Sequence, residues 1–218
     1  MSMSTIEIVE AGIVPYQEAL AWQRDLAEDR IAGRLDHDVL LLLEHPPVVT
    51  LGRNSRAAHV LRPAGVDVVE VERGGDVTYH GPGQLVGYPI LDLGGYKKDL
   101  HWYLRTLEQA LIEALALHDI AAERNPGLTG VWTRGRKIAS IGIHVKQWVT
   151  WHGFALNVAT DLTEFERIVP CGISDVVMTS VQRERGAGSR EQLWQESVDA
   201  VVKGFERVFG AAALQPTD

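Results

Sequence analysis

Three stretches of the chain repeat apolar residues at helical spacing. They cover residues 15–33, 99–118 and 189–209, where apolar side chains recur three and four positions apart. The first stretch opens with a proline, which suits a first helical turn, and the second opens with Asp99, a common N-cap. The third begins with SREQ at 189–192, which matches a capping box. Each stretch therefore predicts a helix that packs one face against a core.

Short runs rich in β-branched and apolar residues lie between these helices and predict strands. The runs cover residues 5–9, 38–43, 67–72, 84–92, 137–145 and 149–159. Only a few residues separate the last two runs, which predicts an antiparallel hairpin. Helices and strands alternate loosely, so the pattern favours an α/β or α+β fold, with a mixed β-sheet flanked by helices, over a strict βαβ repeat. We expect a single domain over residues 1–218.

The composition is that of an ordinary globular protein and excludes several classes of function. The 218 residues are 45% hydrophobic and 23% charged, and the net charge of -8 argues against general nucleic-acid binding. A single cysteine excludes an internal disulfide. The first residues show neither the basic nor the apolar region of a targeting peptide, and no apolar run is long enough to cross a bilayer. We expect a cytoplasmic protein that binds neither nucleic acid nor membrane.

Two segments contain no acidic residue. The segment Arg124–Thr160 carries five lysines and arginines, and a second acid-free run covers residues 48–66. The cations of the second run are Arg53, Arg56 and Arg62. One interpretation is that these charges lie on solvated loops and strand ends. The other is that they share one face, which would suit an acidic macromolecular partner.

The motif RGGDVTYHGPGQ, residues 73–84, concentrates glycines between two predicted strands. Gly81–Gln84 fits a type II turn, and Gly74 and Gly75 allow a ligand to approach the backbone closely. The motif matches neither a dinucleotide fingerprint nor a phosphate-binding loop. It is therefore either a hairpin turn or a ligand cradle. Three neighbouring side chains favour a site: Arg73, Tyr79 and His80.

The motif GRKIASIGIHV, residues 135–145, places a lysine on an apolar strand face. Strand alternation groups Lys137 with four apolar residues: Ala139, Ile141, Ile143 and Val145. Burial disfavours a charged ammonium group, which would make Lys137 a proton acceptor near neutral pH. Alternatively, Lys137 lies at the end of the strand and its amine reaches water. Small residues on the opposite face, Ser140 and Gly142, suit a ligand-facing surface.

Two further residues are candidates for chemistry. His152, in WVTWHGFALNV, either assists a substrate or is a structural histidine. Cys171, in IVPCGISD, lies between a proline and a glycine, which favours exposure in a cleft over burial in the core. A thiol becomes a good nucleophile beside a cation or a base, and Lys137 is the candidate partner. We expect no metal site, because His80, His144, His152 and Cys171 lack the usual zinc-ligand spacing.

Four motifs, in this order, resemble the signatures of the lipoyl(octanoyl) transferase family: RGGDVTYHGPGQ, GRKIASIGI, WHGFALN and IVPCGISD. The resemblance implies the fold of the biotin/lipoate protein ligase catalytic domain and an acyltransferase that needs no cofactor. In that family, octanoyl-acyl carrier protein is the donor. The acceptors are lysines of lipoyl domains, found in the E2 subunits of 2-oxoacid dehydrogenases and in the glycine cleavage H protein.

The resemblance also implies roles for individual residues. Cys171 would carry the acyl group as a thioester, and Lys137 would favour the thiolate and shuttle protons. His152 is expected in a supporting role. The residues expected to hold the substrate are Arg73, Gly74, Gly75, Asp76, Val77, Thr78, Tyr79, His80, Ser140, Ile141, Gly142, Gly153, Phe154 and Ala155.

Three alternatives predict different behaviour. An ATP-dependent lipoate or biotin ligase of the same fold would not need Cys171, and the chain lacks a basic run like that of biotin ligases. A module that only binds carrier proteins or lipoyl domains would show no turnover. A cysteine hydrolase would need His152 as its base.

Overall fold

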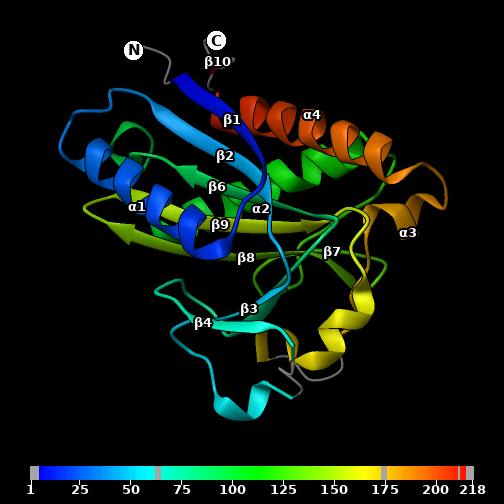
Figure 1. Cartoon of the computed structure of the whole chain (residues 1–218). Coiled ribbons are helices and arrows are strands. Elements are labelled where there is room, and N and C mark those ends of the chain that lie inside the picture. Colours follow the sequence, from blue (N-terminus) through cyan, green and yellow to red (C-terminus); the bar gives the residue numbers. More distant parts are fainter. Residues whose placement is uncertain (1–4, 62–64, 173–175, 211, 215–218) are drawn as a thin grey trace.

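A seven-stranded mixed sheet forms the centre of the molecule (Figure 1). The computed structural model describes residues 5–61, 65–172, 176–210 and 212–214, apart from the side chains of residues 57, 171 and 212–214. The strand order is β10-β1-β2-β6-β9-β8-β7. The strands are β1 (Thr5–Ile13), β2 (Asp38–Glu44), β6 (Gln84–Ile90), β7 (Val131–Thr133), β8 (Arg136–Lys146), β9 (Val149–Asn157) and β10 (Ala212–Leu214). β1 runs parallel to β2 and β10, and the remaining neighbours are antiparallel, so the prediction of a mixed sheet is confirmed.

A second sheet of three short strands lies beside the large one, in the order β4-β3-β5. Its strands are β3 (Val48–Leu51), β4 (Asp67–Glu70) and β5 (Val77–His80). The turn at residues 81–84 is confirmed: Gly83 has a φ of 84°, and the Gln84 N–H donates to the Gly81 carbonyl. The alternative of a hairpin is wrong, because β5 pairs with β3 whereas β6 pairs with β2 and β9. The turn instead carries the chain from one sheet to the other.

Helices cover both faces of the large sheet. The helices are α1 (Tyr16–Ile31), α2 (Leu100–Ala116), α3 (Val181–Arg185) and α4 (Arg190–Phe209). The short 3-10 turns are η1 (Ala57–His59), η2 (Leu93–Gly95), η3 (Leu162–Arg167) and η4 (Pro170–Gly172). The predicted caps are present: Asp99 accepts the Trp102 N–H and Ser189 accepts the Gln192 N–H. Among the described residues, no helix is both long enough and apolar enough to cross a bilayer.

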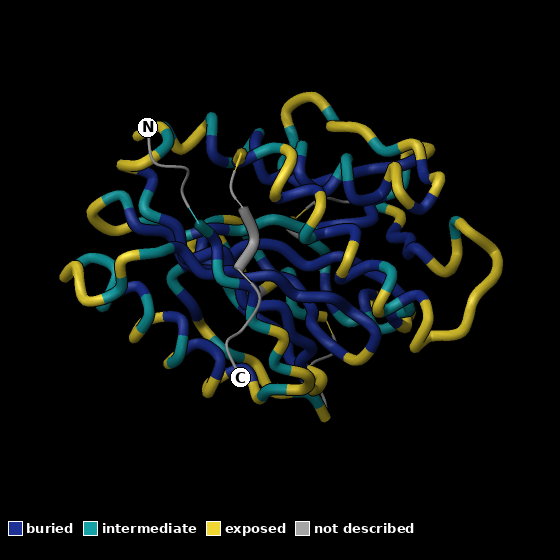
Figure 2. Tube along the Cα trace, turned by 90° about the horizontal axis from the view of Figure 1, so that it is seen from above, coloured by how far each residue is buried: buried dark blue, intermediate teal, exposed yellow. Residues whose placement is uncertain are grey.

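The interior strand β2 shows why the layers hold together. Leu40 and Leu42 point to one face and join the core beneath α2 and α4. Val39, Leu41 and Leu43 point to the other face and pack toward α1. Burial on both faces explains the uninterrupted apolar run. Each fully buried leucine contributes roughly 1.5–3 kcal/mol of transfer free energy. Seen from above, the buried strands fill the middle of the molecule and the exposed residues lie at its rim (Figure 2).

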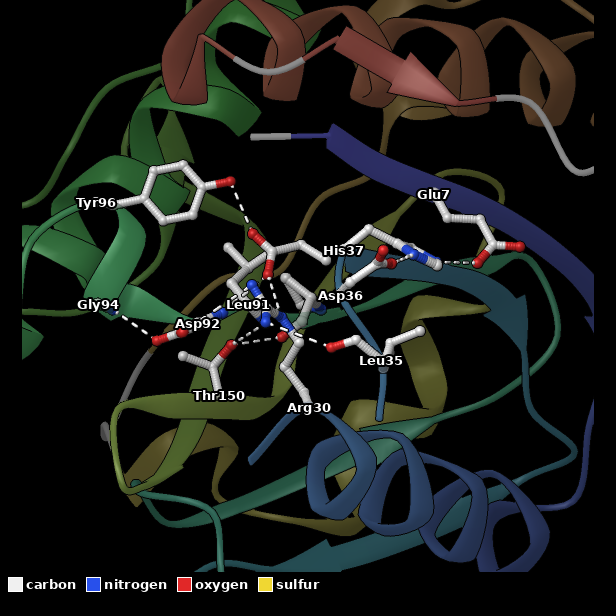
Figure 3. Close-up of polar contacts among 12 residues, drawn as sticks. Glu7, Arg30, Leu35, Asp36, His37, Leu91, Asp92, Gly94, Tyr96 and Thr150 are labelled. Carbon is white, nitrogen blue, oxygen red and sulfur yellow. Dashed lines mark hydrogen bonds and ion pairs between the residues drawn. The ribbon is translucent and has the colours of Figure 1, made fainter. Parts of the chain in front are cut away.

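The buried carboxylate of Asp38 ties α1, the large sheet and the segment before α2 together; Figure 3 labels its partners Arg30, Asp92 and Tyr96. Asp38, 1% exposed, accepts hydrogen bonds from Arg30 Nε (3.0 Å), the Asp92 N–H (3.0 Å) and the Tyr96 hydroxyl (2.9 Å). Desolvation raises the pKa of Asp38, and these three donors oppose that rise. The cluster lies in the structural frame and adds no group to the candidate site described below.

The prediction of one domain over all 218 residues stays a prediction.

Candidate active site

A cavity of ≈ 380 Å³ lies between the small sheet and strands β8 and β9 of the large sheet. Eleven of the fourteen residues expected to hold a substrate line it: Arg73, Gly75, Asp76, Thr78, His80, Ser140, Ile141, Gly142, Gly153, Phe154 and Ala155. His152 lines it as well. Sequence reasoning missed the other lining residues, which are Tyr16, Asn54, Tyr88, Gly127, Leu128 and Thr129. The structure thus brings three of the four motifs to one cavity.

Strand alternation explains two of the three expected residues that do not line the cavity. Val77 and Tyr79 of β5 face away from Thr78 and pack with Val49 and Phe165 in a separate apolar cluster. The third residue, Gly74, has a different function. Its N–H donates to the Ile143 carbonyl at 2.8 Å, which attaches the glycine-rich loop to β8.

Close backbone contacts fix this glycine-rich loop. A Cβ on Gly142 would lie 2.9 Å from the Gly74 carbonyl oxygen, and a Cβ on Gly52 would lie 2.5 Å from the Gly75 carbonyl oxygen. On the same side, the Asn54 N–H donates to the Gly75 carbonyl at 3.0 Å. Because side chains would not fit at either contact, the loop lies directly on β8 and forms one wall of the cavity.

Lys137 is 1% exposed, so its alternative position at a solvent-exposed strand end is wrong. Its Nζ lies 5.0 Å from the centroid of the Trp132 ring, a cation–π distance. A Cβ on Gly130 would lie 2.8 Å from the Lys137 Cε, so the glycine makes room for the side chain. The Lys137 N–H donates to the Val177 carbonyl, and its carbonyl accepts the Thr179 N–H. These two bonds hold the segment that follows the IVPCGISD motif against β8.

The backbone of Cys171 lies in the turn η4, and its side chain lies outside the described part of the structure, as do residues 173–175. The Gly172 N–H donates to the Val169 carbonyl, and the Val169 N–H donates to the His59 carbonyl. Six peptide steps lead from Cys171 to Val177, so their Cα atoms are separated by at most about 20 Å. The turn of Cys171 is therefore only six residues along the chain from the segment Val177–Thr179, which bonds to the backbone of Lys137.

A histidine–aspartate pair that sequence reasoning missed lies against this turn. His59 Nδ1 is 2.7 Å from Asp76 Oδ2, and Asp76 Oδ1 accepts the Val77 N–H. A Cβ on Gly172, whose φ is 66°, would lie 2.4 Å from Asp76 Oδ2. The pair therefore occupies the space beside the turn. Sequence gave no signal for it, because His59 and Asp76 come from separate loops.

The inner end of the cavity is built from buried polar rings. His45 lies between the Tyr88 hydroxyl (2.7 Å) and the Val14 carbonyl (2.6 Å), and the ring centroids of His45 and Tyr16 are 5.0 Å apart. Burial lowers the pKa of His45 to about 4 and raises the pKa of Tyr16 to about 12. Burial likewise lowers the pKa of His80. These rings are therefore uncharged at neutral pH, and the positive charge beside them is that of Arg73, which lines the same cavity.

The acid-free segment is largely neutralised by residues elsewhere in the chain. Arg124 pairs with Glu108 at 3.1 Å, and Arg136 pairs with Glu184 at 2.9 Å. Lys137 is buried, so the five cations of this segment do not share one exposed face. No cluster of three histidine, cysteine, aspartate or glutamate side chains suited to a metal ion occurs among the described residues.

The comparisons with known proteins agree with this geometry. Residues 15–206 match the family described as the lipoyl protein ligase A/B catalytic domain. The octanoyltransferase of Gloeobacter violaceus is 58% identical over 205 residues, which cover 93% of this chain and 90% of that protein. The octanoyltransferase of Nostoc punctiforme is 57% identical over 218 residues, which cover 95% and 90% of the two chains.

Solved structures share the fold at low sequence identity. Lipoate-protein ligase A bound with ATP superposes with a TM-score of 0.72 at 16% identity, covering 99% of this chain and 90% of that one. A lipoate protein ligase of Thermoplasma acidophilum with bound lipoic acid gives a TM-score of 0.71 at 17% identity, covering 99% and 90%. With the identity to the curated relatives, these findings show that the chain belongs to the octanoyltransferases of the lipoyl protein ligase A/B catalytic-domain family.

Proposed function

We propose that this acyltransferase moves an octanoyl group from an acyl carrier protein thioester to a lysine of a lipoyl domain, through a thioester on Cys171. Family membership supports octanoyl transfer in protein lipoylation. The observation that carries the proposed mechanism is the position of Lys137. It is fully buried at the start of β8 and joined through Val177–Thr179 to the turn of Cys171.

The first half-reaction exchanges one thioester for another. Lys137 accepts the Cys171 proton, and the thiolate attacks the carbonyl carbon of the octanoyl thioester. A new C–S bond forms to Cys171, the bond to the carrier sulfur breaks, and the departing thiolate takes the proton back from Lys137. Because the bonds exchanged are alike, this step is nearly balanced in free energy.

The second half-reaction forms an amide. The amine of the target lysine loses a proton to Lys137 and attacks the Cys171 thioester, and the cysteine sulfur leaves as the thiolate. An amide is more stable than a thioester, so this step runs downhill. The cavity holds the acyl chain in both steps. Small residues in its walls leave room for the chain: Ser140, Gly142, Gly153 and Ala155.

The carrier protein and the lipoyl domain are acidic as classes, and we propose that they dock at the mouth of the cavity. Asn54 lines the cavity, and Arg53 and Arg56 on either side of it are exposed. These two arginines replace the Arg124–Thr160 segment as the proposed docking face. The expected cytoplasmic location stays a prediction.

A transfer assay without ATP tests the function. The purified protein is mixed with octanoyl-acyl carrier protein and a lipoyl domain, and the domain is weighed by intact-mass spectrometry. We expect an octanoyl adduct on the lipoyl domain with the native protein and none above background with Cys171→Ala. Transfer only from free octanoate with ATP would establish a ligase instead. Binding of both partners without product would establish a binding module.

A further inference from the structure

We propose that His152, backed by Glu72, forms the end wall of the acyl cavity and limits the acyl chain to about eight carbons. The inference rests on the proposed acyl transfer and assigns the chain-length selectivity of the same cavity. It concerns how long a chain the protein accepts, and its tests differ from the test of whether acyl transfer occurs.

The cavity has an open and a closed end. Asn54 is exposed, and Asp76 and Leu128 are partly exposed, whereas Tyr88 and His152 are buried. The backbone turn of Cys171 and the segment before Gly130 lie beside the open end. Asp76 abuts the turn that carries Cys171, and Leu128 comes two residues before Gly130, which packs on Lys137. An acyl chain whose carbonyl lies at the mouth therefore points its methyl end toward His152.

The strand register gives the length of the cavity wall between Ser140 and His152. Ser140 pairs with Ala155, and Ile143 pairs with His152, three residues further along β8. Three residues of extended strand span about 10 Å. An extended eight-carbon acyl chain has a similar length. The chain would therefore reach His152 at its last carbons.

His152 is held firmly in this position. Its side chain is 1% exposed, its N–H donates to Gln23 Oε1 at 2.9 Å, and its ring packs edge-on to Tyr88. Its φ of 56° is unusual for a residue inside a strand. Neither ring nitrogen has a hydrogen-bond partner among the described residues. Burial lowers the pKa of His152, so the ring is uncharged and can contact an alkyl terminus.

A second cavity of ≈ 390 Å³ lies behind this wall. Glu72 lines it, and Glu72 Oε2 is 3.8 Å from His152 Nε2. Arg24 and the Trp151 indole N–H hold Glu72 in place with hydrogen bonds of 2.8–2.9 Å. The rest of its lining is mixed: Ala27, Ile31 and Trp151 are apolar or aromatic, and Arg24, Glu28, His144 and Lys146 are polar. Removal of the His152 imidazole would lengthen the acyl cavity toward Glu72 and this space.

The test is a competition between octanoyl- and decanoyl-acyl carrier protein, with both acylated products on the lipoyl domain measured by mass. We expect the native protein to prefer octanoyl over decanoyl by about tenfold or more, since two methylenes would meet the wall. In His152→Ala the ratio of kcat/KM for decanoyl to that for octanoyl should rise by about tenfold or more. A native protein that transfers both chains equally well would overturn the inference without any variant. So would an unchanged ratio in His152→Ala.

Two further variants distinguish the loss of the end wall from a general destabilisation of the protein. His118→Ala removes another buried imidazole, which contacts Ser197 between α2 and α4, and should leave the ratio unchanged. If His152→Ala does not fold, His152→Asn retains a residue that tolerates positive φ and should shift the ratio in the same direction by less. The same shift in His118→Ala would overturn the inference. Absence of any transfer by the native protein contradicts the proposed function instead.

Discussion

The two ends of the acyl cavity are built in different ways. The open end consists of loops and turns: Asn54, Asp76, Leu128 and the turn of Cys171. The closed end consists of side chains on regular elements, with Tyr16 on α1, Tyr88 on β6 and His152 on β9. Loops supply reactive groups and partner contacts, whereas strands and helices hold shape most firmly. We therefore propose that the open end carries the chemistry and that the closed end sets the selectivity.

Loss of the nucleophile should have the largest effect and should leave the closed end unaffected. We expect Cys171→Ala to lower the rate of octanoyl transfer by about 1,000-fold or more, because the covalent route is removed. Steady-state transfer to a lipoyl domain measures this. Binding of octanoyl-acyl carrier protein, followed by calorimetry, should persist. Residual transfer near the native rate would place the chemistry elsewhere.

Loss of the buried amine should come next. Lys137→Met keeps most of the side-chain volume over Trp132 but removes the proton acceptor, so we expect acylation of Cys171 to slow by about 100- to 10,000-fold. The pH at which the thiol becomes reactive toward iodoacetamide should also rise. Thermal unfolding checks that the variant folds. An unchanged thiol reactivity profile in a folded variant would remove Lys137 from the activation of Cys171.

Low pH should lower the stability of the protein through His45, at the closed end. Burial lowers the pKa of His45 to about 4, and the rings around it are Tyr16, His80 and Tyr88. The unfolded chain binds a proton at His45 near pH 6.5, but the folded chain binds it only near pH 4. Above pH 6.5, His45 therefore does not lower the free energy of unfolding. As the pH drops from 6.5 to 4, protonation of His45 in the unfolded chain lowers the free energy of unfolding by about 3 kcal/mol.

Urea unfolding at pH 7 and pH 4 tests this assignment. His45→Gln can still contact the Val14 carbonyl and the Tyr88 hydroxyl but does not titrate. We expect its loss of stability between the two pH values to be smaller than that of the native protein by about 3 kcal/mol. Equal losses in the two proteins would show that His45 does not resist protonation in the folded state.

The smallest predicted effect concerns the turn at the open end. Gly172 and Gly186 have similar φ values of 66° and 70°, but only at Gly172 does an added Cβ meet a neighbour, Asp76, at 2.4 Å. Both alanine variants carry backbone strain. The free energy of unfolding of Gly172→Ala should be lower by a further 1–3 kcal/mol, a rough cost of overpacking. Chemical denaturation of the two variants gives the difference. Asp76→Ala should recover part of the loss in Gly172→Ala, and no recovery would rule out this contact.

Much of the fold could be predicted from periodicity. The three long helices and the predicted strands are all present, with ends shifted by a few residues, as at 67–72 against the observed Asp67–Glu70. The short strands β3, β5, β7 and β10 were missed because three or four residues are too few to show a period.

The site was only partly predictable, for a physical reason. The glycine-rich motif carries a local signal, and the family motifs named eleven of the residues that line the cavity. The closed end has no such signal, because Tyr16, His45 and Tyr88 look like ordinary core or turn residues until tertiary contacts bring them together. The neutralisation of Arg124 by Glu108 is likewise a tertiary contact that sequence spacing does not reveal.

The central claim is that the octanoyl group passes through Cys171, and an isolated acyl-enzyme tests it most directly. The protein is mixed with octanoyl-acyl carrier protein without ATP or acceptor, separated from the donor, and analysed by intact-mass and peptide mass spectrometry. We expect one octanoyl group on the peptide that contains Cys171, and its full transfer when a lipoyl domain is added. A protein that stays unmodified while still supporting transfer, or an adduct that the lipoyl domain does not remove, would contradict the account.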